Sequence, residues 1–193
     1  MLSYKESLKI LKETNALLEG HFILSSGLHS NQYVQCAKLL SYPKKAEAIC
    51  SSLCEKIKEE FNTIDIILSP AIGGILVGYE VGRQLDIETI FAERSKEQLI
   101  LRRGFKITKN SNVLIVEDVI TTGKSALECS ELIKASKSKL IGYACIIDRS
   151  DNKSLIKDKI VSQIKLKIDT YTDTELPNDL EKIQPSKPGS RNL

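Results

Sequence analysis

The sequence has no long hydrophobic run and no secretory leader. Nothing in its 193 residues approaches the ~20 apolar residues that a membrane-spanning helix needs. The first nine residues, MLSYKESLK, lack the apolar core of a signal peptide. We therefore expect a soluble, cytoplasmic protein with no membrane partner.

Cysteine and histidine are too few and too scattered for a metal or redox centre. The five cysteines are an odd number, and no pair has zinc-ribbon spacing. Cys50 and Cys54 would share one helix face, but the two histidines, His21 and His29, lie far away in sequence. Reduced, buried thiols are the better interpretation.

Charge of one sign is not concentrated anywhere. Lys and Arg number 28 against 25 Asp and Glu, and the basic residues do not form a stripe. This pattern favours a solvated surface over a nucleic-acid partner. The 41% of apolar residues, without repeats or low-complexity segments, predicts one globular domain over residues 1–193.

Apolar periodicity and turn residues predict alternating helices and strands. The expected helices are 3–18, opened by a Ser3–Glu6 capping box, and 43–61, 75–85 and 122–137. The expected strands are 64–68, 89–93, 113–118 and 140–148, with two short strands within 21–40 and an edge strand at 163–172. We read 94–104 as a loop or hairpin and 176–193 as an irregular tail. The alternation predicts an α/β parallel sheet with ligands beyond the carboxyl ends of its strands.

The most informative segment is VLIVEDVITTGKS, from Val113 to Ser125. Its unbroken apolar run is typical of a buried parallel strand. The adjacent acids Glu117 and Asp118 suit hydroxyl groups or a hydrated metal, and we expect them where the strand ends. A hydroxyl-rich turn containing Gly at a helix start presents free N–H groups to an anion, although Thr and Ser also cap ordinary helices. The spacing is not that of a Walker A loop. The segment predicts a sugar-phosphate site.

Two further turns follow expected strands. Ile72, Gly73 and Gly74 could offer N–H groups to an anion, or could simply be glycines in a tight turn. Arg149 follows the strand 140–148 and has a planar guanidinium that suits a carboxylate. We expect the turns after Leu68, Asp118 and Ile147 to form one composite site.

VLIVEDVITTGKS resembles the phosphoribosyl-diphosphate (PRPP) binding motif of the type I phosphoribosyltransferases. The wider chain resembles the orotate phosphoribosyltransferases among them, and its ending is similar to a short-loop bacterial branch. The segments that carry this likeness are Phe22–Gly27 with Ser30 and Tyr33, Ser69–Ile75, Phe91–Arg94, Asp148–Arg149 and Pro188–Arg191. The resemblance implies a mainly parallel central sheet flanked by helices, with a small hood. The hood would come mainly from residues 1–42, with a contribution from 160–175 left open and a tail at 176–193.

The resemblance also implies a reaction: PRPP and orotate would give orotidine 5′-monophosphate and pyrophosphate in pyrimidine biosynthesis. Mg²⁺ would be held mainly by PRPP, with no direct protein ligand. Glu117, Asp118 and Lys96 would be catalytic, and Thr121 and Arg149 would bind orotate. The implied PRPP-binding residues are Ile72, Gly73, Arg94, Lys96, Glu117, Asp118, Val119, Ile120, Thr121, Thr122, Gly123, Lys124 and Ser125.

The cationic segment 94–104 would reach the neighbouring subunit's site, which implies a homodimer. It contains Arg94, Lys96, Arg102 and Arg103, but it is short, with one Lys and no His. Longer-loop relatives use a Lys and a His there, so Lys96 is the residue expected to assist pyrophosphate departure. Two alternatives remain: a purine phosphoribosyltransferase, against which Arg149 counts, and a PRPP-sensing regulator that binds nucleic acid. The sequence shows no DNA-binding extension.

Overall fold

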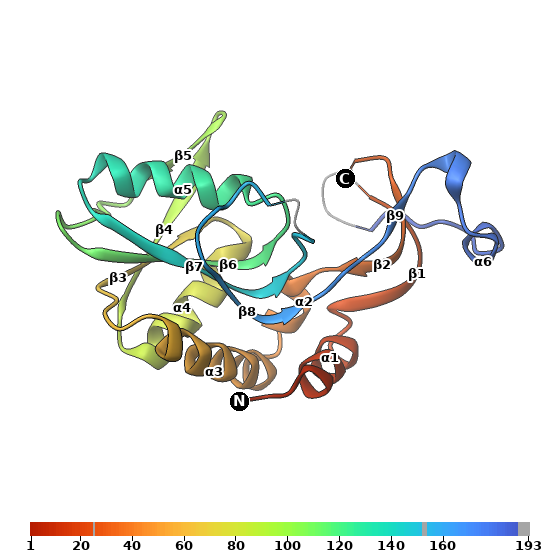
Figure 1. Ribbon diagram of the computed structural model, residues 1–193, viewed down its shortest axis with the longest axis horizontal. Helices are drawn as coiled ribbons and strands as arrows, with labels where there is room; N and C mark the ends of the chain where they lie inside the picture. Colours follow the sequence, from red (N-terminus) through yellow and green to blue (C-terminus); the bar gives the residue numbers. More distant parts are fainter. Residues whose placement is uncertain (25, 152–153, 189–193) are drawn as a thin grey trace.

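The computed structural model describes residues 1–24, 26–151 and 154–188. Two sheets make up the architecture (Figure 1). The larger has six strands in the order β5-β4-β3-β6-β7-β8, and the smaller has three in the order β1-β2-β9. Ser25 and the residues 189–191 of the family-like ending lie outside the described residues.

The elements alternate through the middle of the chain, as the sequence predicts. The helices are α1 Tyr4–Glu13, α2 Cys36–Leu40, α3 Pro43–Glu60, α4 Gly73–Leu85, α5 Lys124–Ala135 and α6 Asn178–Glu181, with a 3-10 turn η1 at Asp173–Glu175. The strands are β1 Leu17–Ile23, β2 His29–Val34, β3 Ile66–Pro70, β4 Glu88–Ser95, β5 Gln98–Leu101, β6 Asn112–Ile120, β7 Lys139–Asp148, β8 Ile160–Lys165 and β9 Thr170–Tyr171.

The larger sheet is parallel except at one edge. β4, β3, β6, β7 and β8 pair in parallel, and β5 turns back antiparallel to β4 as a hairpin. α3 and α4 cover one face of the sheet and α5 covers the other (Figure 1). The predicted α/β fold with a mainly parallel sheet is confirmed.

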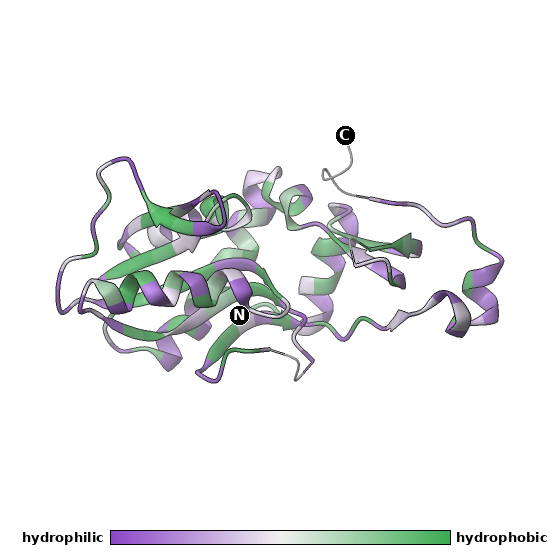
Figure 2. Cartoon of the chain, turned by 90° about the horizontal axis from the view of Figure 1, so that it is seen from above, coloured by the Kyte–Doolittle hydropathy of each residue, from purple (hydrophilic) through white to green (hydrophobic). Residues whose placement is uncertain are grey.

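The burial of β6 on both faces of the sheet explains why its apolar run is unbroken. Leu114 and Val116 lie in a buried cluster with residues of α3 and α4, whereas Val113 and Ile115 lie in a second cluster with residues of α5. Successive side chains of a strand point to opposite faces, so both faces are buried only when every position is apolar. The strands of this sheet are accordingly mostly green in Figure 2, whereas the helices also carry purple, outward-facing positions.

Three glycines bring α4 into close contact with the sheet. A β-carbon added at Gly78 would lie 2.1 Å from the Ser69 hydroxyl oxygen, and one at Gly82 would lie 1.9 Å from the Thr89 hydroxyl oxygen. Gly74 is similarly tight against β6, at 3.2 Å from the Val116 carbonyl oxygen. These glycines are spaced four residues apart and therefore share one helix face. Any larger side chain there would push α4 off the strands.

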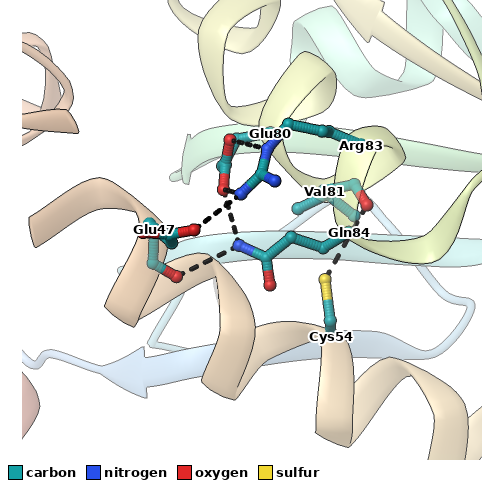
Figure 3. A network of polar contacts seen from close by, with 6 residues as sticks. All are labelled: Glu47, Cys54, Glu80, Val81, Arg83 and Gln84. Carbon is teal, nitrogen blue, oxygen red and sulfur yellow. Dashed lines mark hydrogen bonds and ion pairs between the residues drawn. The ribbon is translucent and has the colours of Figure 1, made fainter. Parts of the chain in front are cut away.

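Polar groups join α4 to α3 at the surface (Figure 3). Arg83 donates to Glu80 on its own helix at 2.8 Å and to Glu47 on α3 at 2.9 Å. Gln84 donates to the Glu47 carbonyl oxygen at 3.1 Å. Exposed pairs of this kind stabilise little in water, so the position of α4 depends more on its glycine contacts with the sheet than on these ion pairs with α3.

The smaller sheet, which we call the hood, is tied to the C-terminal segment. His21 and His29 are buried in it, and their Nε2 and Nδ1 atoms lie 2.5 Å apart. His29 also contacts Asp173 at 2.5 Å, and His21 contacts the Ile183 carbonyl oxygen at 2.8 Å. The segment 176–193, expected to be an irregular tail, therefore contains α6 and contacts the hood at His21. The turn η1, which directly precedes that segment, contacts the hood at His29.

The first helix is shorter than the sequence predicts. The capping box is confirmed: the Glu6 N–H donates to the Ser3 side chain, and Glu6 accepts from the Ser3 N–H. The helix then ends at Glu13, because Asn15 adopts the left-handed φ of 55° and breaks the helical ladder. The expected extension to Leu18 is wrong; that residue lies in β1.

Two other boundaries also differ. The bounds of the expected edge strand 163–172 are wrong: β8, at the edge of the larger sheet, ends at Lys165, and β9 pairs with β2 in the hood. The second of the two strands expected within 21–40 ends at Val34, and the short helix α2 follows it. The partner of β9 comes from a distant part of the chain, which local periodicity does not record.

The expectation of buried, reduced thiols is confirmed, because all five cysteines are free and buried. Burial raises the pKa of the Cys36 and Cys145 thiols well above the ordinary value, so these groups stay protonated. No helix within the described residues is long and apolar enough to cross a membrane.

Gly78→Ala should lower the free energy of unfolding by about 1–3 kcal/mol, the cost of overpacking a tight interface. Helix propensity alone would favour Ala by about 1 kcal/mol, so the two effects have opposite signs. Urea unfolding measures the difference. Ser69→Ala in the same chain removes the clashing hydroxyl and should recover part of the loss. A more stable Gly78→Ala protein would contradict the close approach of α4.

Candidate active site

Glu117 and Asp118 lie inside β6 rather than at its end. The ladder to β7 continues through Glu117 and Cys145 to Ile120 and Asp148, so the expected end at residue 118 is two residues short. The two carboxylates therefore follow the strand's alternation. A β-carbon added at Gly73, the first residue of α4, would lie 2.8 Å from both Asp118 oxygens. Glu117 lies on the α5 side of the sheet, near Cys129. The pKa of Cys129 is raised first by its own burial and then by the charge of Glu117.

Both carboxyl groups resist ionisation. Burial raises the pKa of Glu117, and the neighbouring Asp118 charge raises it further. Burial also raises the pKa of Asp118, although its hydrogen bond from the Val119 N–H, at 2.9 Å, opposes this effect. A pair of partly buried acids is stabilised by hydroxyl donors or a cation, so the arrangement is suited to bind one.

The turn after β6 leaves backbone donors available. Gly123 occupies the cap position of α5 with a φ of 79°, and no side chain of the described residues caps the helix there. Thr121, Thr122 and Lys124 are exposed around it. The cap residue is glycine, and the Thr122 hydroxyl accepts from the Lys124 N–H at a long 3.4 Å. The helix start and the exposed side chains beside it are suited to an anion.

A second helix begins beside the acidic pair. β3 extends through Ser69 and Pro70, and α4 begins at Gly73. The turn between them is therefore shorter than expected and consists of Ala71 and Ile72. The peptide bond between these two residues is cis, and the Ile72 side chain is 86% exposed. The contact between Gly73 and Asp118 places the N-terminus of α4 next to β6. Two helix N-termini therefore flank one pair of carboxylates.

Arg149 adds a half-buried cation with no countercharge among the described residues. Its backbone N–H donates to the Ile120 carbonyl oxygen at 2.8 Å, which places it beside the end of β6. Burial lowers the pKa of its guanidinium, with Tyr33 and Cys36 nearby and opposing the effect. Its buried Nε has no hydrogen-bond partner, and no carboxylate among the described residues pairs with it. Such a group is suited to a bound anion.

The hood reaches this cation through β2. Tyr33 packs against Phe22 with ring centroids 5.8 Å apart, so these two aromatic residues of the family-like segment lie together. Ser30 of the same segment is buried and donates to the Asp169 carbonyl oxygen at 2.9 Å, which is a structural contact. Sequence reasoning missed Cys36, whose thiol lies 3.8 Å from the Asp118 carbonyl oxygen. No local signal could reveal a contact across 82 positions.

The cationic segment 94–104 is the β4–β5 hairpin, and most of its charges are paired. Arg94 contacts Glu128 of α5 at 2.6 Å, and Arg102 lies 3.5 Å from Glu93. Arg103 also pairs with Glu93. Lys96 is exposed at the tip of the hairpin, which projects from the body of the protein (Figure 1). The structure thus brings Arg94 to α5 and leaves Lys96 exposed at the hairpin tip.

A resident metal has few protein ligands here. Among the described residues, no group of three or more His, Cys, Asp or Glu side chains could hold an ion. Glu117 and Asp118 nevertheless fit Mg²⁺, which keeps several waters and needs only one or two carboxylates beside substrate oxygens. The site therefore suits a Mg²⁺ ion that arrives with a phosphorylated substrate.

Comparisons with known proteins agree with this geometry. Residues 40–177 match the family model "Phosphoribosyl transferase domain". The curated orotate phosphoribosyltransferase of Chlorobaculum parvum is 45% identical over 190 residues, covering 98% of this chain and 97% of that protein.

Solved structures share the fold. The orotate phosphoribosyltransferase of Aeropyrum pernix has a TM-score of 0.71 at 22% identity, over 82% of this chain and 92% of that one. The adenine phosphoribosyltransferase of Thermoanaerobacter pseudethanolicus has a TM-score of 0.61 at 15% identity, over 70% and 88%. The fold is therefore common to enzymes named for different bases, and the sequence likeness to the Chlorobaculum protein makes the narrower assignment: this chain belongs to the orotate phosphoribosyltransferase family.

Proposed function

We propose that this chain transfers the 5-phosphoribosyl group from PRPP to orotate, giving orotidine 5′-monophosphate and pyrophosphate in pyrimidine biosynthesis. Family membership supports the reaction. The observation that carries the choice of orotate is Arg149, a half-buried cation beside the acidic pair that pairs with no carboxylate of the described residues. Orotate supplies that carboxylate, whereas a purine base does not.

The PRPP half of the site uses β6 and the turn after it. The N–H groups and hydroxyls of Thr121 to Ser125 bind the 5′-phosphate at the start of α5, with the backbone of Val119 and Ile120 leading into the turn. Glu117 and Asp118 accept from the ribose hydroxyls and stabilise the positive charge that develops on the sugar. Ile72 and Gly73, at the start of α4, donate to the pyrophosphate.

Mg²⁺ bound with PRPP supplies charge neutralisation for the departing pyrophosphate. PRPP oxygens and water would hold the ion, with Glu117 and Asp118 beside it on the ribose hydroxyls.

The orotate half lies between Arg149 and the hood. The guanidinium of Arg149 donates to the orotate carboxylate, and Thr121 contacts the base from the end of β6. Tyr33 lies near Arg149 and, with Phe22, covers this side. Exclusion of water by the hood strengthens the charge interaction.

The working unit is a homodimer in the cytoplasm, with each chain acting as one catalytic domain. Ile72, Leu76 and Tyr79 are 86%, 56% and 63% exposed and lie along one side of the start of α4, next to the acidic pair. A second copy on this face would cover them and bring its Lys96 hairpin tip toward the neighbouring pyrophosphate turn. The buried thiols support a reducing compartment.

Orotate should disappear when the protein is mixed with Mg²⁺ and PRPP, followed by orotate absorbance. Adenine and hypoxanthine, supplied separately, should not react. Consumption of a purine instead of orotate would establish the purine alternative. PRPP binding without turnover of any base would favour the regulator.

The same assay tests Arg149. Arg149→Ala should lower kcat/KM for orotate by about 10- to 150-fold, the effect of losing a charged hydrogen bond of 1.5–3 kcal/mol. Arg149→Lys keeps the charge but loses the planar fork, so it should recover activity only in part. An unchanged kcat/KM for Arg149→Ala would remove this residue from the orotate site.

The acidic pair should make unliganded stability depend on pH. A carboxyl with a raised folded pKa stabilises the fold fully below its unfolded pKa, and that contribution is lost as pH rises toward the folded value. Glu117→Gln removes the titration, so its melting temperature should exceed the wild-type value by about 2–4 °C at pH 8. Glu131→Gln, on the exposed side of α5, is the control. A destabilised Glu117→Gln protein at pH 8 would contradict the assignment, and turnover should fall in any case.

Two inactive variants should complement each other if Lys96 works across the dimer. Lys96→Ala and Asp118→Asn subunits, refolded together, form mixed dimers with one intact site. About a quarter of wild-type activity is expected from random pairing of two subunit types. Activity no higher than the mean of the two parents would place Lys96 in its own subunit's site or outside catalysis.

A further inference from the structure

The connection from β7 to β8 touches the turn after β6 at a second point, beyond Arg149. The backbone N–H of Leu155 donates to the Thr122 carbonyl oxygen at 3.0 Å. Arg149, at the start of the same connection, donates to the Ile120 carbonyl oxygen at 2.8 Å. Consecutive parts of the PRPP turn are therefore held by one short segment that follows the neighbouring strand.

Ile156 supports the same turn from the side. A β-carbon added at Gly123 would lie 2.7 Å from two side-chain carbons of Ile156, so the Ile156 side chain packs directly against the Gly123 backbone. Ile156 is only 6% exposed and belongs to the buried cluster beneath α5. The Ser154 hydroxyl accepts from the Ile156 N–H at 3.0 Å and fixes the approach of this segment.

The turn needs such support. Gly123 has a φ of 79°, and the backbone of glycine is more flexible than that of any other residue. Thr121, Thr122 and Lys124 are exposed on the open side of the turn. N–H donors stabilise an anion well only when they are held in place before it binds, because reorganisation otherwise costs free energy.

We infer that Ile156 and the Leu155 N–H are positioning residues for PRPP, holding the Thr121–Ser125 donors in the arrangement that receives the 5′-phosphate. This inference rests on the proposed function. Neither group touches substrate; both act through Thr122 and Gly123. The pyrophosphate turn at Ile72 and Gly73 belongs to a different strand end and does not depend on them.

That separation gives a test that a general loss of stability would not satisfy. Ile156→Ala should raise KM for PRPP about tenfold, because uniform binding of the phosphate is lost. The inhibition constant of inorganic pyrophosphate, which occupies the other turn, should change less than about twofold by the same reasoning. Ile156→Val keeps most of the contact and should raise KM for PRPP less than Ile156→Ala does.

The Leu155 N–H is tested independently. Leu155 is 61% exposed, so its side chain is dispensable, and Leu155→Ala should behave as wild type. Leu155→Pro removes the donor and should raise KM for PRPP while leaving pyrophosphate inhibition unchanged. Circular dichroism and thermal unfolding identify any variant that fails to fold. If Ile156→Ala or Leu155→Pro fails to fold, Ile156→Val and Leu155→Ala take their place. A KM for PRPP that rises in Ile156→Val and not in Leu155→Ala then supports the inference.

Parallel rises in KM for PRPP and in the pyrophosphate inhibition constant would overturn the inference, since they would indicate general damage to the site. An unchanged KM for PRPP in Ile156→Ala would overturn it too. Failure of the proposed function is a separate result, because it appears in the wild-type protein as absence of orotate turnover with PRPP and Mg²⁺.

Discussion

The position of β6 between β3 and β7 determines which chemical groups can meet. Parallel pairing in register brings the carboxyl ends of all three strands to one edge of the sheet. The start of α4 then lies against Asp118, and Arg149 is bonded to Ile120. Antiparallel pairing of either neighbour would send its turn to the opposite edge. The acidic pair, two helix N-termini and the guanidinium share a site because of this single arrangement.

The site combines groups that each disfavour the unliganded fold. Two partly buried acids repel each other, and a buried guanidinium has no countercharge among the described residues. Replacing these groups with apolar residues of similar shape would give a more stable protein. Their charges complement those of a sugar phosphate, a divalent cation and a carboxylate. The apolar clusters on both faces of the sheet, with α4 packed tightly through its glycines, provide the stability that tolerates them.

Local patterns predicted the parts of the fold whose causes are local. The capping box at Ser3 and the helix from Pro43 depend on neighbouring residues, and both are confirmed. The boundary near Asn15 and the division of 163–172 into β8 and β9 were missed. Each depends on backbone conformation or on a partner strand that the local sequence does not specify. The same limit applies to the site: Cys36 and Ile156 have no motif of their own.

The sequence by itself determined which chemical groups exist and in what order: an apolar strand, two acids, a glycine-containing turn and a following Arg. These follow from residue type and short spacing, which helix and strand geometry translate directly. The tertiary structure alone decided that Glu117 and Asp118 lie within a continuing strand. It also decided that the Nε of Arg149 is buried without a partner in the described residues, that Arg94 pairs with Glu128, and that Ile156 packs on Gly123. Those outcomes depend on strand order and on contacts between segments far apart in the chain, which no short window of sequence contains.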